Sequence, residues 1–233
     1  MTGGEGATAT RSQGAQDFLP RRGGLPSLRS AAGGCRGCAL YRDATATVFG
    51  SGPASARFFL VGEVPGDQED RQGEPFVGPA GRLLGHAMAD AGMDRKMAYL
   101  TNAVKHFRFT RDEGGKRRIH KKPSRGQIAA CRPWLLAELA AVRPEIIVCL
   151  GATAAQSLLG NDFRVTRERG VLLGPQDLPE HNAMAERPEA APRVLATVHP
   201  SAILRAKGED RTDAYDEFVS DLRAAASEST DPT

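Results

Sequence analysis

Four runs of apolar residues recur along the chain, separated by stretches in which apolar and polar residues mix. The runs cover residues 56–61, 99–105, 145–150 and 193–198. They are almost continuous instead of alternating, which is typical of strands buried on both faces of a sheet. Amphipathic stretches between and after them predict helices over residues 82–91, 126–141, 152–159 and 213–225. Strands that alternate with helices indicate an α/β fold, a four-stranded parallel sheet with helices on both faces.

Polar side chains lie where three of these predicted strands end: Glu63, Asn102 and His199. The carboxyl ends of parallel strands form one crevice, where open α/β sheets bind their ligands. A carboxylate at Glu63 can orient a water or a histidine, and an amide at Asn102 suits the edge of a nucleobase. His199 can donate to a carbonyl oxygen. The structural alternatives are a glutamate facing solvent in a turn and a histidine satisfied at a strand end.

Two glycine-rich segments border this predicted crevice. Gly62-Glu-Val-Pro-Gly66 ends the first strand, and its glycines let backbone N–H groups approach a ligand closely. Phe76-Val-Gly-Pro-Ala-Gly81 opens the first helix. Phe76 either stacks on a planar base or is an ordinary core phenylalanine.

Composition indicates one ordinary domain with tails. The chain has 233 residues, of which 40% are apolar and 25% charged. We expect a disordered arm over 1–33, a domain over 34–225 and a frayed tail over 226–233. Residues 161–192 predict an irregular excursion with a hairpin near 171–173. No run approaches the roughly 20 apolar residues of a membrane span, and no signal peptide is present, so we expect a cytoplasmic monomer without membrane contact.

Basic charge is concentrated between residues 105 and 125. This window holds nine Lys or Arg and two Asp or Glu, a local net charge of +7, whereas the whole chain carries +3. Such a concentration suits a polyanion, because phosphate contacts supply most nucleic-acid affinity. A solvated, flexible loop is the plain alternative. Gly114 and Gly115 permit a tight reversal, and Pro123 with Ser124 indicates the start of a helix.

The chain has four cysteines, and their spacing suggests ligation. Cys35 and Cys38 form a CxxC pair, and Cys131 and Cys149 follow far downstream. A CxxC pair with two further thiolates can hold a zinc ion or an iron–sulfur cluster, and composition does not choose between them. Taken alone, Cys149 in an apolar strand is equally well explained as a small buried hydrophobe.

These motifs together resemble a known family. The two glycine-rich segments, Thr101-Asn102, His199-Pro-Ser201 and the four cysteines resemble the family-four iron–sulfur uracil-DNA glycosylases, over about residues 34–222. Lys116-Arg-Arg-Ile-His120 resembles the loop of the UdgX branch, which is named for binding uracil-DNA irreversibly. The resemblance implies a uracil-DNA glycosylase-like α/β/α sandwich.

The resemblance also implies roles for individual residues. Phe76 stacks on an extruded uracil, Asn102 reads its edge and His199 contacts its O2. Glu63 acts as the acid–base residue, and His120 attacks deoxyribose C1′ in place of water. We further expect the neighbouring cations to lower the pKa of His120 and keep it neutral; these cations are Arg117, Arg118, Lys121 and Lys122.

The remaining implied contacts are with DNA and the cofactor. Further substrate contacts fall to Gly62, Val64, Gly66, Ser201 and Arg205. The loop residues Lys116, Arg117 and Arg118 face DNA, with Arg118 towards the cluster. A structural [4Fe–4S] cluster is held by Cys35, Cys38, Cys131 and Cys149.

One departure from the branch concerns its Gly-Glu-Gln-Pro-Gly segment, in which this chain has Val64. If the loop binds through backbone amides, we expect Val64→Gln to leave uracil binding intact.

The main hypothesis from the motifs is excision of uracil with covalent attachment through His120, best on single-stranded DNA. The alternatives are a turnover glycosylase that releases uracil, and a non-catalytic module that only binds uracil-DNA.

Overall fold

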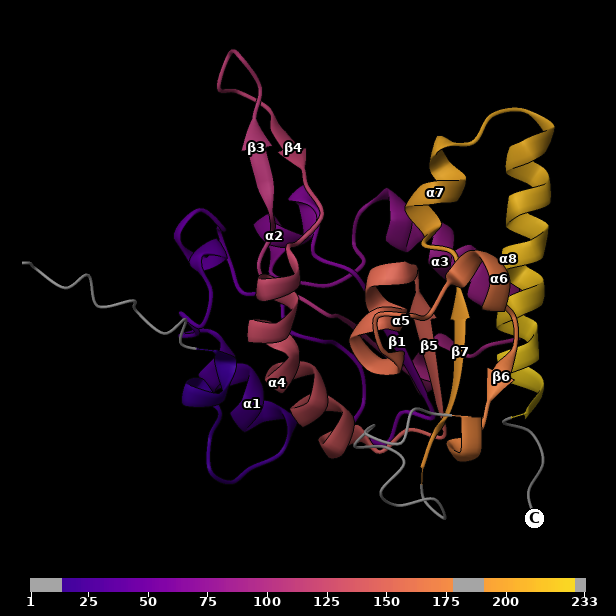
Figure 1. Cartoon of the computed structure of the whole chain (residues 1–233), viewed down its shortest axis with the longest axis horizontal. Helices are drawn as coiled ribbons and strands as arrows, with labels where there is room; N and C mark the ends of the chain where they lie inside the picture. The colour runs from indigo at the N-terminus through magenta and orange to yellow at the C-terminus, as the bar shows by residue number, and fades with distance from the viewer. Residues whose placement is uncertain (1–13, 178–190, 229–233) are drawn as a thin grey trace, which may run out of the picture.

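A five-stranded sheet forms the centre of the protein (Figure 1). The computed structural model describes residues 14–177 and 191–228. The sheet order is β2-β1-β5-β7-β6, with bounds Ala98–Asn102, Phe58–Gly62, Ile146–Leu150, Arg193–Thr197 and Leu172–Leu173. The first four strands are parallel, as predicted, and β6 pairs antiparallel with β7. The short β6 is an edge strand that sequence patterning did not count.

Helices cover both faces of the sheet, and alternate residues of each strand point to opposite sides. Phe59, Val61 and Ile147 pack against α4 (Arg125–Val142) and α5 (Ala152–Leu159). Phe58 and Leu60 pack against α3 (Pro79–Asp90) and α8 (Glu209–Glu228) on the other side. This arrangement confirms the predicted α/β architecture, because a strand buried on both faces has no polar side to show.

Two short helices extend from loops at the carboxyl edge of the sheet, and the sequence did not predict them. They are α2 (Asp67–Gln72) and α7 (Pro200–Arg205). His199 is the N-cap of α7, where its side chain accepts from the Ser201 backbone N–H. The remaining short elements are α6 (Val165–Glu168), η2 (Ala39–Arg42), η3 (Arg95–Met97) and η4 (Pro175–Asp177).

The basic segment folds into a β-hairpin, β3 (Phe109–Arg111) with β4 (Arg118–His120). It stands clear of the sheet in Figure 1, and its reversal passes through Gly115, whose φ is +68°. The chain then enters α4 through a capping box, in which Ser124 accepts from the Gln127 N–H and the Gln127 side chain accepts from Ser124 N–H. The predicted helix start at Ser124 is therefore confirmed.

Part of the expected disordered arm is ordered. Residues 15–18 form η1 (Ala15–Phe18) and residues 25–32 form α1 (Leu25–Ala32). Ala15, Leu28 and Ala32 are buried in a third core beside α4. Only residues 1–13 of that arm lie outside the described residues, as does the Pro- and Glu-rich part of the excursion at 178–190. α8 also continues to Glu228, past the expected start of the frayed tail.

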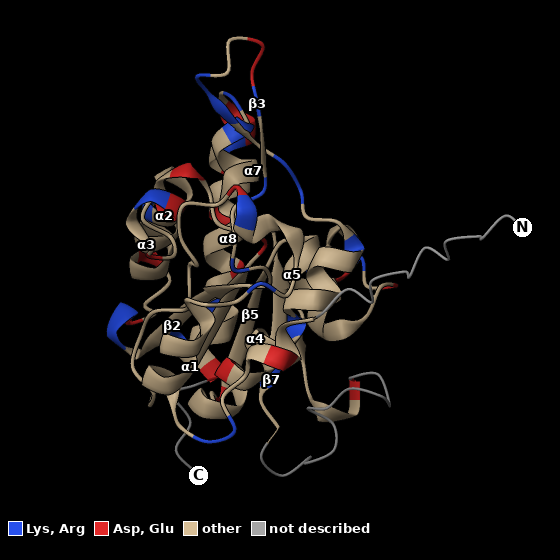
Figure 2. Ribbon diagram, turned by 90° about the vertical axis from the view of Figure 1, so that its left-hand side faces the viewer, with Lys and Arg blue, Asp and Glu red and all other residues tan. Residues whose placement is uncertain are grey.

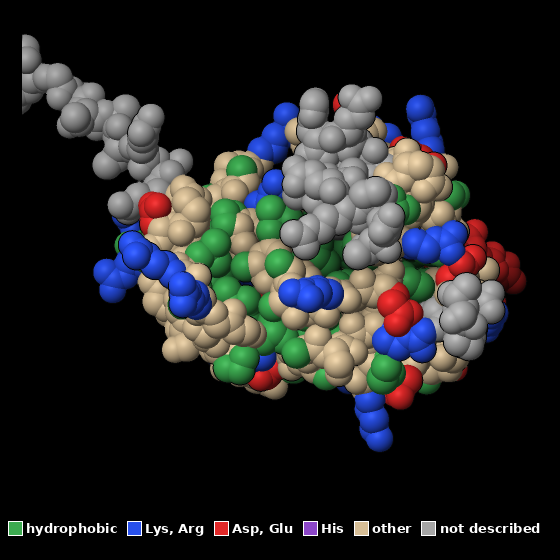
Figure 3. Space-filling model, turned by 90° about the horizontal axis from the view of Figure 1, so that it is seen from below, with side chains coloured by type: hydrophobic (Ala, Val, Ile, Leu, Met, Phe, Trp, Pro, Cys, Tyr) green, Lys and Arg blue, Asp and Glu red, His purple; other side chains and the backbone are tan. Residues whose placement is uncertain are grey.

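No helix in the described ranges is long and apolar enough to cross a bilayer. The underside of the molecule in Figure 3, where the strands begin, shows apolar side chains interspersed with scattered charges of both signs.

Candidate active site

Gly62, Asn102 and Phe76 meet at the carboxyl ends of β1 and β2. Gly62 pairs with Asn102 across the two strands. A Cβ at Gly62 would overlap Asn102 Oδ1 and come within 2.7 Å of Phe76 Cζ. The Asn102 amide and the edge of the Phe76 ring therefore converge over a position with no side chain. The structure thus brings together the two side chains that the sequence analysis expects to contact a planar base.

Phe76 is held in an unusual backbone conformation. Its φ is +59°, one of two positive values for non-glycine residues in the described chain. Bulky residues adopt this region rarely, because it costs about 1–3 kcal/mol. Gly81 packs directly beneath it, since a Cβ there would overlap the Phe76 carbonyl. The helix that begins at Pro79 thus fixes the ring, and Gly81 is required for a packing reason that sequence alone did not reveal.

Glu63 lies immediately after β1, and its carboxylate has a defined partner. Thr153, on the first turn of α5, donates its hydroxyl to Glu63 Oε2 at 2.7 Å. This bond fixes one carboxylate oxygen and leaves the other for a second partner. Thr153 was not among the predicted site residues, because a threonine in a first helical turn has no distinctive sequence signal.

His199 is half-buried, and its hydrogen bonds define its tautomer. Nδ1 accepts from the Ser201 backbone N–H at 3.1 Å and lies 2.9 Å from Ser201 Oγ. A nitrogen that accepts from an amide carries no proton, so the proton of the neutral ring is on Nε2. Burial, with the charges of His120 and Arg205, lowers the pKa of His199 to about 4. His199 is therefore a neutral donor near pH 7.

Arg205 closes this side of the crevice. It donates from Nη1 to Ser201 Oγ at 3.3 Å and otherwise remains exposed. Its charge contributes to the lowered pKa of both His199 and His120. Ser201 thus contacts both residues, and the predicted grouping of His199, Ser201 and Arg205 is present.

His120 comes from the hairpin to the same crevice. Its pKa is lowered first by burial and then by the positive charges of Arg205 and Lys122, while Glu63 and Glu69 oppose the shift. The expected direction is therefore correct, but its main cause is burial. Of the four cations proposed from the sequence, only Lys122 contributes, and Arg118 is paired instead with Asp67 and Asp70.

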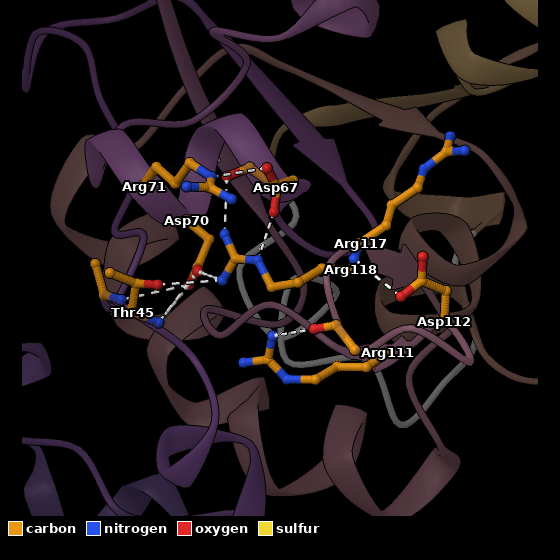
Figure 4. Close-up of polar contacts among 10 residues, drawn as sticks. Thr45, Asp67, Asp70, Arg71, Arg111, Asp112, Arg117 and Arg118 are labelled. Carbon is orange, nitrogen blue, oxygen red and sulfur yellow. Dashed lines mark hydrogen bonds and ion pairs between the residues drawn. The ribbon is translucent and has the colours of Figure 1, made fainter.

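Arg118 ties the hairpin to α2 (Figure 4). Its Nε pairs with Asp67 Oδ1 and its Nη1 with Asp70 Oδ2, each at 2.5 Å. The guanidinium also stacks over the rings of Phe107 and Phe109, 5.2 and 5.1 Å from their centroids. The Arg118 side chain thus anchors the hairpin to α2. It is not free to contact DNA, in contrast to the role that the family resemblance implied for it.

Lys105 is also removed from the basic surface. It is fully buried and pairs with Glu138, and its Nζ donates to Asn102 O at 2.7 Å. Glu138 accepts in addition from Tyr99 and Thr101 hydroxyls. The exposed positive charge of the hairpin comes from the other cations, including Lys116, Arg117 and Lys121, and Figure 2 shows blue segments along it together with a red stretch at its tip.

Glu69 is a second carboxylate near His120 that the sequence did not single out. It is largely buried, and its Oε1 accepts from the Gly78 backbone N–H at 2.8 Å. Gly66 and Gly78 both leave room for this carboxylate, since a Cβ at either would lie within 3 Å of it. Glu69 therefore connects α2 to the loop that carries Phe76.

The comparisons with known proteins agree with this geometry. The sequence model of the Uracil DNA glycosylase superfamily matches residues 49–223. The chain belongs to this superfamily. It is 34% identical over 193 residues to the Type-4 uracil-DNA glycosylase of Archaeoglobus fulgidus, covering 81% of this chain and 85% of the relative. The Type-4 uracil-DNA glycosylase of Thermotoga maritima is 33% identical over 177 residues, covering 76% and 81%.

In this superfamily member, three cysteines gather and the fourth does not. Cys35, Cys38 and Cys131 border the third core, where Trp134 Nε1 donates to Cys35 Sγ at 3.2 Å. Burial, partly offset by Lys105 and reinforced by the other two thiols, raises the pKa of Cys131 to about 12. Cys149 is fully buried among the residues between the sheet and α4 and α5. The structure therefore does not bring Cys149 together with the other three cysteines, because its strand parity points its side chain into another core.

The described residues also contain no group of three or more His, Cys, Asp or Glu arranged to hold one metal ion. The residues present accordingly do not fit a four-cysteine site. A buried histidine, His106, directly follows Lys105, whose backbone N–H donates to Cys131 Sγ at 3.3 Å. Burial lowers the pKa of His106 to about 4, and His106 Nε2 lies 2.9 Å from Thr47 Oγ1.

Val64 does not face the crevice. Its side chain is buried in the third core. Only its backbone is available to a ligand, in line with binding through loop amides. Glutamine at this position would place an amide in an apolar core, so Val64→Gln is expected to lower the free energy of unfolding by about 1–3 kcal/mol.

Proposed function

We propose that this chain excises uracil from DNA and then stays attached to the deoxyribose through His120. The excision follows from the superfamily and from relatives that are named Type-4 uracil-DNA glycosylases. The attachment rests on one observation: the hairpin brings His120 within electrostatic reach of Glu63, His199 and Arg205. The substrate is uracil-containing DNA, with single strands favoured because extrusion of the base then costs least.

In the first step, the extruded uracil lies against Phe76 with its edge on the Asn102 amide. The bond between C1′ and N1 breaks, and its electron pair leaves with the base. His199 Nε2–H donates to the O2 atom of the departing anion, because the other ring nitrogen is occupied by Ser201. Neutral His199 stabilises the charge without transferring a proton.

In the second step, the sugar is an oxocarbenium-like electrophile. A ring nitrogen of neutral His120 supplies its lone pair to C1′ and forms a C–N bond. The positive charge moves to the imidazole, and the proton on its other nitrogen passes to Glu63, which Thr153 orients. Water no longer has access to C1′, so turnover stops.

The test is a gel of protein mixed with labelled uracil-DNA and boiled in detergent. The native protein is expected to give a boil-resistant complex, and His120→Ala to give none while retaining salt-sensitive binding. His120→Ser leaves room for water and is expected to release uracil and yield an alkali-labile site. An adduct with His120→Ala would exclude His120 as the nucleophile.

Two other functions have distinct outcomes in the same assay. A turnover glycosylase releases free uracil repeatedly and forms no boil-resistant complex. A non-catalytic module gives only salt-reversible binding. The position of His120 at the crevice favours attachment over both.

For the cofactor, we propose an iron–sulfur cluster whose ligands include Cys35, Cys38 and Cys131 but not Cys149. The cluster would supply a structural tie between the CxxC segment and α4, both of which border the third core. No step of the reaction depends on it.

A further inference from the structure

A hollow of about 450 Å³ lies between α3, α7 and the beginning of α8. Its polar lining comes from Arg82, His86, Arg211, Thr212 and Tyr215, and none of the residues that line it is acidic. Guanidinium groups are the side chains best suited to bind phosphate, and no lining carboxylate competes for them. The hollow takes no part in the chemistry assigned to Glu63, His120 and His199.

The arginines are available for a ligand. Both are exposed, and Arg82 donates from Nη1 to the Val77 carbonyl at 3.3 Å, a neutral acceptor. The Tyr215 hydroxyl, in contrast, donates to Asp90 at 2.6 Å, which holds the ring in place as part of the wall. The apolar part of the wall includes Pro79, Leu83 and Leu204. This mixture suits a nucleotide, which has a phosphate and an apolar base face.

The hollow is lined in part by residues that neighbour the proposed active site in the sequence. Pro79 follows the Phe76 loop directly, and Leu204 precedes Arg205. In Figure 1, α7 and the top of α8 lie at one end of the carboxyl edge of the sheet, and the hairpin lies at the other. A strand that places its uracil between them therefore passes the hairpin on one side and this hollow on the other.

We propose that the hollow between α3, α7 and α8 binds the DNA nucleotide next to the extruded uridine, on the side away from the hairpin, through Arg82 and Arg211. This inference rests on the proposed function, and it predicts that the enzyme reads single-stranded substrate with a polarity. Nucleotides on only one side of the uridine are expected to contribute to binding through these two arginines.

The experiment compares two fluorescent single strands, one extending only 5′ of the uridine and one only 3′. The uridine carries a 2′-fluorine, which resists cleavage, so fluorescence anisotropy reports binding independently of reaction. The variants are Arg82→Ala, Arg211→Ala and the double substitution. The control is Arg57→Ala, which removes a half-buried arginine, paired with Glu145, just before β1 at the amino edge of the sheet.

The double variant is expected to bind one of the two strands at least about ten-fold more weakly and the other as the native protein does. The salt dependence of binding should fall for that strand alone, by about 0.7 in log–log slope for each phosphate contact removed. Equal losses on both strands, or no loss on either, would overturn the proposal. The proposal would also be overturned if a free deoxynucleoside monophosphate bound in the hollow while the two single strands bound equally well.

The two proposals fail separately. Absence of uracil release on ordinary uracil-DNA would remove the proposed function while leaving directional binding measurable. Normal uracil release without a directional effect on binding would contradict only the proposed role of the hollow. Both arginines are exposed, so thermal melting of the variants is expected to match that of the native protein.

Discussion

Gly62 is the residue at which the geometry of the proposed base site is most tightly constrained. A side chain there would strike both Asn102 and Phe76. Each of these residues is fixed by its own surroundings, Asn102 by the sheet and Phe76 by Gly81. Backbone positions therefore set the space available in the proposed base site. A substitution at Gly62 can reduce this space without disturbing the hydrophobic cores.

We expect Gly62→Ala to lower the rate of uracil release about 100-fold, because displacements of about 1 Å in reacting groups have effects of that size. Single-turnover release from single-stranded uracil-DNA measures it. Gly85→Ala is the matched control, since a Cβ at this exposed helical position meets nothing within 4 Å. Equal rates for both variants would show that Gly62 does not define the base site.

A second expectation concerns pH. The lowered pKa of His120 means that the ring is neutral at pH 7 and becomes protonated only below its ordinary range near 6.5. Protonation removes the lone pair that attacks C1′, whereas His199, with a pKa of about 4, stays neutral. Acidification from pH 7 towards 5 should thus reduce attachment more than uracil release. Parallel gel and uracil-release assays across this range measure the ratio, and a constant ratio would contradict the assignment of His120.

Among the secondary-structure elements, the β3–β4 hairpin depends on a single side chain for its attachment to α2. Arg118 binds Asp67 and Asp70, and Asp70 also accepts from the backbone N–H groups of Thr45 and Ala46. The hairpin, α2 and the segment after η2 are held by one cluster of charges. Asp70 is fully buried, so removal of its partner leaves an isolated charge.

We expect Arg118→Ala to abolish attachment to DNA and to increase amide hydrogen exchange across residues 109–120, while the sheet stays protected. The cost to the free energy of unfolding should be about 3 kcal/mol, the lower end for breaking a buried pair. Arg117→Ala is the control, because it removes an exposed cation next to the anchor on the same hairpin. Normal attachment by Arg118→Ala would mean that the hairpin positions His120 without this anchor.

The sequence predicted the elements with a strong periodicity of apolar residues, but it did not predict the elements of only a few residues. The four parallel strands, α4 with its Ser124 cap and the placement of Glu63, Asn102 and His199 at strand ends follow from patterns along the chain. The two-residue β6 and the one-turn helices α2 and α7 are too short to show a period. Lys105 and Arg118 are charged residues in a basic segment, and only tertiary packing shows that both are neutralised by buried carboxylates.

For the molecule as a whole, three cores divide the four cysteines unequally. Cys149 belongs to the core between the sheet and α4 and α5, and the other three belong to the core beside α1. Spacing along the chain could not separate them, because strand parity decides which face a residue occupies.

We expect Cys131→Ser to lose iron and much of its solubility, since ligand binding at a structural site is part of folding. Cys149→Ser should keep its iron and lose only the packing of a buried thiol. Iron content and visible absorbance of protein purified without oxygen measure both. Stoichiometric zinc in the native protein would overturn the iron–sulfur assignment, and loss of iron from Cys149→Ser would overturn the assignment of ligands.

The hairpin joins β2 to α4 without contributing a strand to the main sheet. Both of its flanking segments lie at the carboxyl edge, and in the proposed reaction this insertion alone brings His120 to C1′. The proposed attachment through His120 implies that exchange of this one segment would convert a hydrolytic enzyme into a self-attaching one, or the reverse, without rebuilding the scaffold. A lineage could gain or lose irreversible capture of damaged DNA through a single loop replacement, and the same graft offers a route to engineered proteins that mark uracil permanently.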